Sequence, residues 1–474
     1  MKNMSKYYIT TAIPYINAKP HIGHAMEFIQ TDVLARFHRI IGDDTYFLTG
    51  SDDNSLKNVL SAEAAGINVD DFVKQHAEIF KTLATTLNIS NDDFIRTVEE
   101  RHKLGVEKLW EACKKDIYKK TYKGRYCVGC EEFKKVEDLD KGCCPEHPNK
   151  PLETIEEENY FFKLSNYQKK LEELIEKDEY KIVPETRKNE VLSFIKRGLE
   201  DFSVSRSQER AKGWGIPVPG DPSQVIYVWF DALGNYITAL GYGTGDKLFD
   251  NYWPADAHVV GKGITKFHAI YWPAMLLSAG VALPKKLFVH GYFTVDGQKM
   301  SKSLGNVIDP EDLVLKYGVD AVRYFLLREI PSTKDGDFSI KRFEERFTSD
   351  LSNELGNLVQ RTLTMINKYE VKVKYKDSDF PSDIASLIKD FSFDKALVSI
   401  WTKVKAQNQF IEENKPWELA KNDKQSLADV LTSIYSNLCE ISVALSPFMP
   451  DTSKKIKEQL NNLKPEAIFP RLEK

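Results

Sequence analysis

Residues 6–50 constrain the fold more than any other part of the chain. Residues 6–12 (KYYITTA) are rich in β-forming side chains, and residues 45–50 (TYFLTG) form a second such run. Between them, isoleucine, valine and phenylalanine recur at helical spacing over residues 21–40, and Gly42 ends that pattern. A strand, a helix and a strand at these lengths predict a parallel α/β unit.

The α/β pattern stops and later resumes. Residues 122–151 are rich in Gly, Cys, Lys and Glu without a sustained period, so we expect an insertion within the α/β domain. A helix is expected over residues 266–279, and the pattern is helical almost throughout from residue 341, which favours a separate bundle. Further buried strands are expected at residues 225–229, 258–260 and 286–290.

Composition places the chain among globular proteins of several domains. Its 474 residues are 42% hydrophobic and 29% charged, which excludes extensive disorder. The net charge is −4, so an anionic partner would have to bind at local basic patches. No targeting segment is visible, and the most apolar stretch, residues 269–283, is shorter than a ~20-residue membrane span. We therefore expect a cytoplasmic protein.

Four of the six cysteines crowd into one short stretch, which favours a metal knuckle over a disulfide scaffold. Cys127-x-x-Cys130 followed by Cys144-x-x-His147 has the spacing of a structural zinc site with three thiolates and one imidazole. Cys143, beside Cys144, leaves open which of these two thiols is the ligand. A zinc ion at such a site would crosslink a segment that is too polar to fold by burial of apolar side chains alone.

The motif Pro20-His21-Ile22-Gly23-His24 lies between the first expected strand and the first expected helix. Ligands of parallel sheets bind beyond the carboxyl ends of the strands, and a helix N-terminus favours phosphate. The two histidines can donate hydrogen bonds to phosphate oxygens, and Gly23 leaves room for a flat base. Two surface histidines on a first helical turn would explain the motif equally well if it stood alone.

A second motif, Lys299-Met300-Ser301-Lys302-Ser303, follows far downstream between two glycines. Two ammonium groups on such a loop can neutralise charge that develops on a departing pyrophosphate. An isolated pair of lysines is more often a solvated basic loop. The two motifs in this order, however, are a much stronger signal than either alone.

In these motifs the chain resembles the class I aminoacyl-tRNA synthetases, whose signatures HIGH and KMSKS both occur here letter for letter. The resemblance narrows to the methionyl-tRNA synthetase family and covers nearly the whole chain. It implies an α/β fold with a Rossmann-type parallel sheet, an inserted zinc-knuckle domain and an all-α anticodon-binding bundle. Further segments that carry it include residues 126–131 (YCVGCE), 227–232 (YVWFDA), 268–273 (HAIYWP) and 415–417 (KPW).

The resemblance also implies how the chain is divided into domains. The insertion is short and mostly occupied by the knuckle, so we expect no separate editing domain. The chain ends soon after the bundle, so we expect a monomer. The implied divisions are 1–115 and 223–285 for the two halves of the catalytic domain, 116–222 for the connective insertion with its zinc knuckle, 286–340 for the KMSKS loop and stem-contact region, and 341–474 for the helical anticodon-binding domain.

The activity that the resemblance implies is ATP-dependent ligation of L-methionine to methionine tRNAs, initiator and elongator, through methionyl-adenylate. Mg²⁺ would accompany ATP, and catalysis would consist of positioning and charge stabilisation. The residues implied to bind ATP are His21, Gly23, His24, Lys299, Ser301 and Lys302. Those implied to be catalytic are His21, His24, Lys299, Lys302 and Arg206. The implied zinc ligands are Cys127, Cys130, Cys144 and His147, because the Cys-Pro-x-His pattern of the family favours Cys144 over Cys143.

Two further sets of residues match family positions. One set would bind methionine, with aromatic rings suited to a thioether and Asp52 paired with the α-ammonium group. Its members are Ala12, Tyr15, Asp52, Trp229, Tyr236, Ile264 and His268. The other would read the anticodon by stacking and base-edge hydrogen bonds, and its members are Asn357, Arg361 and Trp417. Without the resemblance, ordinary core packing would explain Trp229, Ile264 and Trp417 as well.

The chain departs from the family in two places. Residues 50–55 read GSDDNS where the family usually has GTDEHG, so Asp52 is kept but the following His and Gly are lost. Residues 261–264 read GKGI where the family usually has GKDI, so an aspartate expected near the ATP ribose is replaced by Gly263. Losing such a charged hydrogen bond would cost ~1.5–3 kcal/mol of nucleotide affinity unless another group compensates.

Two alternatives therefore stay open at the level of sequence. One is a class I synthetase of other specificity, with cysteine the nearest chemical neighbour. The other is a synthetase-like RNA-binding protein that has lost adenylation, for which Gly263 and the altered loop after Asp52 are the motivation. Both signature motifs and the matching anticodon residues are intact, which favours an active methionine enzyme.

Overall fold

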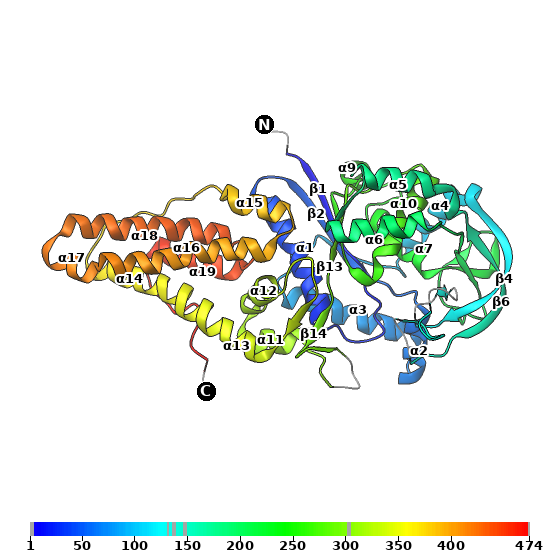
Figure 1. Ribbon diagram of the computed structural model, residues 1–474, viewed down its shortest axis with the longest axis horizontal. Coiled ribbons are helices and arrows are strands. Elements are labelled where there is room, and N and C mark those ends of the chain that lie inside the picture. The colour runs from blue at the N-terminus through cyan, green and yellow to red at the C-terminus, as the bar shows by residue number, and fades with distance from the viewer. Residues whose placement is uncertain (1–3, 130–131, 135–138, 146–148, 301–304, 473–474) are drawn as a thin grey trace.

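The computed structural model describes residues 4–129, 132–134, 139–145, 149–300 and 305–472. An α/β part and a long helical domain lie end to end, with the C-terminal helices extending away from the central sheet (Figure 1). None of the helices in these ranges combines the length and the apolar character that crossing a membrane requires. The predicted α/β fold with a helical C-terminal domain is confirmed.

The central sheet is parallel, with the strand order β3-β2-β1-β12-β13-β7. From β1 the chain passes through α1 (Ile22–Ile40) to β2 on one side, and β12 pairs with β1 on the other side. The carboxyl ends of β1 and β12 therefore form the switch point at which open α/β sheets bind ligands. The strands are β1 (Lys6–Thr11), β2 (Asp44–Ser51), β3 (Asp93–Arg96), β7 (Lys181–Val183), β12 (Ala257–Gly261) and β13 (Lys286–His290).

Most of the predicted strands are confirmed, but the one predicted at residues 225–229 is wrong. β11 (Asp221–Ile226) ends at Ile226 in a small antiparallel sheet with β9 (Ser205–Ser207) and β10 (Pro217–Val218). Val228 and Trp229 begin the helix α7 (Val228–Leu233) instead. A short apolar run does not distinguish a strand from a buried helical turn, which explains the error.

Helices cover both faces of the sheet. Successive β1 residues, Tyr8 and Ile9, belong to different hydrophobic clusters because side chains alternate across a strand. The cluster of Ile9 includes α1 and continues into the helical domain. The other helices of this part are α2 (Leu56–Ala65), α3 (Val69–Thr86), α4 (Glu100–Cys113), α5 (Gln168–Glu176), α6 (Glu185–Lys196), α8 (Asn235–Thr238), α9 (Lys247–Tyr252) and α10 (Trp272–Ala279), the last preceded by a π-helix at Phe267–Tyr271.

The insertion is built on a long antiparallel ribbon of β4 (Ile117–Cys127) and β6 (Glu153–Phe162), which runs along the outer edge of the α/β part (Figure 1). β5 (Glu132–Lys134) and β8 (Phe202–Ser203) flank the ribbon. β7, which lies within the same stretch of sequence, instead pairs with β13 in the central sheet. The insertion is therefore anchored to the catalytic sheet as well as to its own ribbon.

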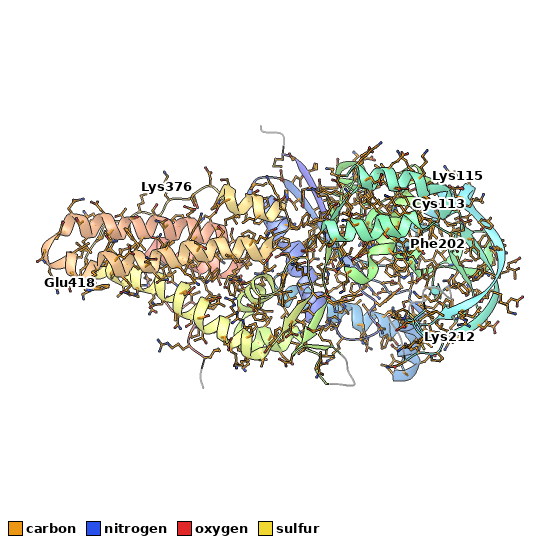
Figure 2. The ribbon with its side chains drawn as sticks, in the orientation of Figure 1. Cys113, Lys115, Phe202, Lys212, Lys376 and Glu418 are labelled. Atoms are coloured by element: carbon orange, nitrogen blue, oxygen red, sulfur yellow. The ribbon has the colours of Figure 1, made fainter. Side chains whose placement is uncertain are left out.

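A hairpin of β14 (Phe293–Val295) and β15 (Gln298–Lys299), on which β16 (Gly336–Phe338) also pairs, precedes the helical domain. Glu418, labelled in Figure 2, lies at the tip of this domain, far from Phe202 in the α/β part. The helices that follow the hairpin are α11 (Pro310–Tyr317), α12 (Val319–Arg328), α13 (Ile340–Arg346), a π-helix at Phe347–Gly356, α14 (Asn357–Lys368), α15 (Ser382–Lys389), α16 (Phe393–Asn414), α17 (Pro416–Asn422), α18 (Lys424–Leu445) and α19 (Pro450–Asn462).

Candidate active site

Tyr15 and Asp52 meet at the carboxyl edge of the central sheet. Tyr15 follows β1 and Asp52 follows β2, and the two residues form an isolated parallel bridge. The Asp52 N–H donates to the carbonyl of Pro14 at 2.9 Å, and the Asp52 side chain is almost fully buried. Lys57 Nζ lies 4.2 Å from the centre of the Tyr15 ring. A carboxylate therefore stands beside an aromatic ring at the edge where a ligand is expected.

His21 and His24 lie at the N-terminus of α1, and each ring nitrogen Nδ1 accepts a backbone N–H. Gly23 N donates to His21 Nδ1, and His21 N donates to His24 Nδ1, both at 3.1 Å. Because Nδ1 is an acceptor in both rings, the proton of each neutral imidazole resides on Nε2. Burial lowers the pKa of His21, and burial together with His21 and His290 lowers the pKa of His24 well below its ordinary value. The pair is therefore neutral at pH 7 and offers N–H donors rather than positive charges.

Gly23 also has a local role in the cap of α1. A Cβ atom at this position would lie 2.9 Å from Cε1 and 3.0 Å from Nδ1 of His21. The absence of a side chain thus lets the ring of His21 fold back over the first turn and cap the helix. That Gly23 also leaves room for a flat base stays a prediction.

The predicted methionine residues Trp229, Tyr236 and His268 come together around one aromatic cluster. Trp229 stacks on Phe267 with ring centres 3.7 Å apart, and its edge meets Tyr15 at 6.1 Å. The Tyr236 hydroxyl lies 2.7 Å from His268 Nε2, while His268 Nδ1 lies 2.9 Å from the carbonyl of Ile264. Burial lowers the pKa of His268 to about 4, so this imidazole is neutral at pH 7. The result is an apolar aromatic wall with few, mutually satisfied polar groups.

Glu27 belongs to this region, although the sequence did not mark it as a candidate site residue. Its Oε1 accepts the N–H of Ala12 at 2.9 Å, and its Oε2 lies 2.8 Å from His290 Nε2. The carboxylate therefore connects the ends of β1 and β13 across the switch point. Its partners lie far from it in the sequence, so the sequence alone could not name them.

The altered loop after β2 is held by a buried polar network. Asn54 N donates to Asp52 Oδ1 at 3.2 Å, and Asn54 Nδ2 donates to Asp231 Oδ2 at 2.7 Å. The other oxygen of Asp231 lies 2.6 Å from His102 Nε2. Asn58 Nδ2 donates to the carbonyls of Asp52 and Asp53, each at 2.9 Å. Asp52 is thus positioned although the usual His and Gly are missing.

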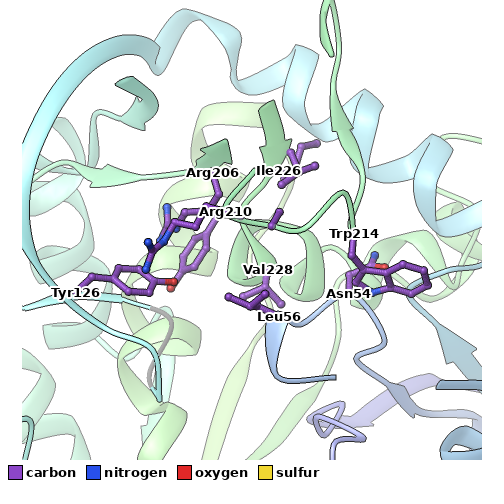
Figure 3. Close-up of a pocket in the computed structure, with 11 residues that line it drawn as sticks. Asn54, Leu56, Tyr126, Arg206, Arg210, Trp214, Ile226 and Val228 are labelled. Atoms are coloured by element: carbon purple, nitrogen blue, oxygen red, sulfur yellow. The ribbon is translucent and has the colours of Figure 1, made fainter. Parts of the chain in front are cut away.

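Arg206 lines a pocket between the insertion and the catalytic half (Figure 3). Its guanidinium lies 4.1 Å from the centre of the Tyr227 ring, and Nη1 donates to Ser203 Oγ at 2.9 Å and to the Ser205 carbonyl at 2.7 Å. Arg210 lies in the same pocket and stacks on Tyr126 at 4.1 Å. The pocket is therefore positively charged and lined by aromatic rings.

The lysine motif and the knuckle are described only in part. Lys299 pairs with Thr294 in the β14–β15 hairpin, but its side chain lies outside the described residues, as do Ser301 and Lys302. Cys130 and His147 also lie outside them. Within the described ranges no group of three candidate metal ligands occurs.

Two of the predicted zinc ligands, Cys127 and Cys144, are described and both are fully buried in a polar segment. Cys127 ends β4. Cys143 is half-buried, and its backbone exchanges hydrogen bonds with Asp140. Of the two adjacent cysteines, Cys144 is thus the buried one, and its assignment as the zinc ligand stays a prediction.

The predicted anticodon residues lie toward the tip of the helical domain. Asn357 and Arg361 are one turn apart on α14, and Arg361 Nη2 pairs with Glu412 Oε1 near the end of α16 at 2.8 Å. Trp417 follows Pro416 in α17, which begins two residues after α16 ends and forms the tip next to α14 (Figure 1). The three residues therefore share one end of the bundle, far from the sheet.

Family comparisons agree with this arrangement. The family model for class I tRNA synthetases (M) matches residues 7–151 and 147–363, and the model for the anticodon-binding domain of methionyl tRNA ligase matches residues 377–471. This chain belongs to the methionyl-tRNA synthetase family. Its activity is the ATP-dependent ligation of methionine to tRNA.

Individual relatives of this synthetase support the same conclusion. The chain is 46% identical to the methionine–tRNA ligase of Caldanaerobacter subterraneus subsp. tengcongensis, over 96% of this chain and 74% of that protein. It is 45% identical to the enzyme of Brucella suis biovar 1, over 96% and 92% of the two chains. The Mycobacterium tuberculosis methionyl-tRNA synthetase in complex with methionyl-adenylate has a TM-score of 0.90 at 38% identity, over 99% of this chain and 100% of that one. These matches favour methionine over any other amino acid.

Proposed function

We propose that this synthetase forms methionyl-adenylate at the switch point between β1 and β12 and then transfers the methionyl group to the terminal adenosine of methionine tRNAs, initiator and elongator. The observation that carries the proposal is the convergence of Asp52, the aromatic cluster and the two capping histidines at one edge of the sheet. Each of these groups suits a different part of the two substrates.

Asp52 and the aromatic cluster suit methionine. The buried carboxylate of Asp52 pairs with the α-ammonium group, beside the ring of Tyr15. Ala12, Trp229, Tyr236, Ile264 and His268 form the wall for the side chain, in which aromatic rings contact the thioether sulfur. A neutral His268 avoids placing a charge in that wall. The free carboxylate of methionine then attacks the α-phosphorus of ATP, and pyrophosphate leaves with the bonding electrons.

His21 and His24 suit the phosphates of ATP. As neutral donors at a helix N-terminus, they bind phosphate oxygens together with the helix dipole, and Gly23 permits that geometry. Lys299 and Lys302, with Ser301 between them, supply the positive charge for the leaving pyrophosphate, and Mg²⁺ arrives with ATP. Arg206 is assigned a supporting electrostatic role from its pocket.

A structural zinc ion fits the knuckle. Cys127 and Cys144 are buried in a segment with few apolar residues, as thiolate ligands of a metal would be. Cys130 and His147 complete the proposed set of four. When bound, zinc supplies a crosslink between the two ends of the segment.

The helical domain is proposed to recognise the anticodon. Trp417 stacks on an unstacked base, and Asn357 and Arg361 hydrogen-bond base edges. Arg361 would exchange its ion pair with Glu412 for a base. We further propose a cytoplasmic monomer divided into domains as the sequence predicts.

Pyrophosphate–ATP exchange tests the proposal. Purified, zinc-loaded protein is assayed with each amino acid in turn, and exchange is expected with methionine alone. Exchange with a different amino acid would overturn the assigned pocket. Absence of exchange with every amino acid, from folded protein, would favour the RNA-binding alternative.

A further inference from the structure

Gly263, where the family usually has an aspartate, lies directly against Tyr292. A Cβ atom at residue 263 would be 2.1 Å from Tyr292 Oη and 3.2 Å from its Cζ. Because 2.1 Å is far inside van der Waals contact, a side chain at residue 263 would force the ring of Tyr292 to move. The phenol hydroxyl thus occupies the space into which a side chain at residue 263 would project.

The position of Tyr292 is fixed by its neighbours. Its N–H donates to Asp335 Oδ1 at 2.8 Å, and its carbonyl accepts the N–H of Gly336 at 2.9 Å. Lys262 Nζ lies 4.4 Å from the centre of the Tyr292 ring and pairs with Asp335 at 2.6 Å. The backbone contacts hold the residue, and the ammonium group holds its ring through a cation–π contact. This placement is a property of the whole cluster rather than of one flexible side chain.

The cluster stands where the sugar of a nucleotide is expected. Gly263 follows β12 and Tyr292 follows β13, and these two strands pair in parallel. The histidines proposed to bind phosphate lie at the start of α1, which follows β1 on the other side of β12. A nucleotide whose phosphates lie at α1 therefore extends its nucleoside across the ends of β12 and β13. Tyr292 is 49% exposed, so a ligand can reach it from that side.

We propose that Tyr292 binds ATP, with its hydroxyl hydrogen-bonded to a ribose hydroxyl in place of the missing aspartate. The inference rests on the proposed function, since it assumes ATP at the switch point. A phenol can accept a hydrogen bond, as a carboxylate does, and can also donate one. Gly263 and Tyr292 then compensate for each other. The absence of a side chain at residue 263 leaves space for the Tyr292 hydroxyl, which replaces the missing carboxylate.

The first test compares Y292F with the wild type, using ATP, 2′-deoxy-ATP and 3′-deoxy-ATP in methionine-dependent pyrophosphate exchange and in calorimetric binding. Y292F is expected to raise the KM and Kd for ATP about three- to tenfold, the usual effect of one hydrogen bond. The KM for methionine stays unchanged. The preference for ATP over one of the two deoxynucleotides falls by the same factor. Y375F is the matched control, because the Tyr375 hydroxyl bonds Asp377 in the helical domain at 3.1 Å and its removal should change neither preference.

The outcomes separate the inference from the function on which it rests. If Y292F keeps the wild-type preference for ATP over both deoxynucleotides, or weakens all three nucleotides equally, Tyr292 does not contact the sugar and the inference is wrong. If the wild-type protein shows no methionine-dependent exchange, the proposed function fails, while calorimetry still measures the effect of Y292F on nucleotide binding.

A second variant tests whether a side chain at residue 263 and the Tyr292 hydroxyl compete for the same space. G263D places its Cβ against the hydroxyl, and we expect it to lower kcat/KM for ATP about tenfold, which corresponds to the lost hydrogen bond plus displacement of the ring. In the Y292F background the nearest ring atom is 3.2 Å from that Cβ, so the same substitution should be much less harmful. Equal losses from G263D in both backgrounds would show that the two positions are independent.

Discussion

Arg323 links the helical domain to the α/β part, and its removal should destabilise the whole protein. Arg323 lies on α12 and is fully buried, and its Nη2 pairs with Asp32 Oδ2 of α1 at 2.7 Å. The same guanidinium donates to the carbonyls of Phe448, Pro447 and Leu87 at 2.8–3.1 Å. R323M fills a similar volume but leaves a buried carboxylate and three carbonyls without this donor. Breaking a buried pair in this way costs about 3–5 kcal/mol.

Urea unfolding followed by circular dichroism measures this effect. The matched control is R342M, which breaks a pair between Arg342 and Glu329 with side chains 45% and 21% exposed. An exposed pair of this kind contributes at most about 1 kcal/mol. If R323M lowers the free energy of unfolding by no more than R342M does, the guanidinium does not tie the two domains together and the reasoning fails.

The same pair predicts a pH dependence. Burial raises the pKa of Asp32, but Arg323 and Arg36 outweigh it and leave that pKa below its ordinary value. A carboxyl whose pKa is lower in the folded state stabilises the fold above its unfolded pKa of about 3.9, and this contribution is lost as the pH falls through the folded value. R323M removes the charge that lowers the pKa of Asp32 most. The free energy of unfolding of R323M should therefore fall less between pH 5 and pH 3 than that of the wild type.

Three further predictions concern the proposed sites. C144S should lower the zinc content measured by metal mass spectrometry, and C143S should retain it; equal retention in both would exclude Cys144 as a ligand. W417A should raise the KM for tRNA at least about tenfold, as expected for one lost base stack, without changing methionine-dependent exchange; an equal effect on exchange would indicate misfolding instead. Burial lowers the pKa of His268 to about 4, so its neutral form stabilises the fold above pH ~6.5 and this contribution is lost as the pH falls toward 4. The urea midpoint of H268Q should therefore depend less on pH between 7 and 5 than that of the wild type, and an identical dependence would show that folding does not lower the pKa of His268.

Local patterns were sufficient to predict four strands of the central sheet, β1, β2, β12 and β13, whereas the short strands β3 and β7 were missed. β1, α1 and β2 follow directly from hydrophobic spacing, because their buried faces are set by residues close in sequence. Trp229 shows the limit of such patterns, since the apolar run that includes it crosses from β11 into α7. Its stacking on Phe267 depends on how α7 packs against a π-helix 38 residues later in the chain. No periodicity within either segment carries that information.

The loop after β2 shows why a departure from a family pattern is best judged by its buried partners. From the sequence, losing the usual His and Gly after Asp52 placed the geometry of the ammonium site in doubt. The structure supplies the missing donor from Asn54, whose amide reaches Asp231, a residue 177 positions away. Buried carboxylates require such donors, because leaving a buried charge without a hydrogen-bond partner costs much free energy of folding. His102 on the other oxygen of Asp231 completes the set. The loop therefore keeps Asp52 in place through a different pairing, which argues against the reading in which the altered residues signal a lost activity.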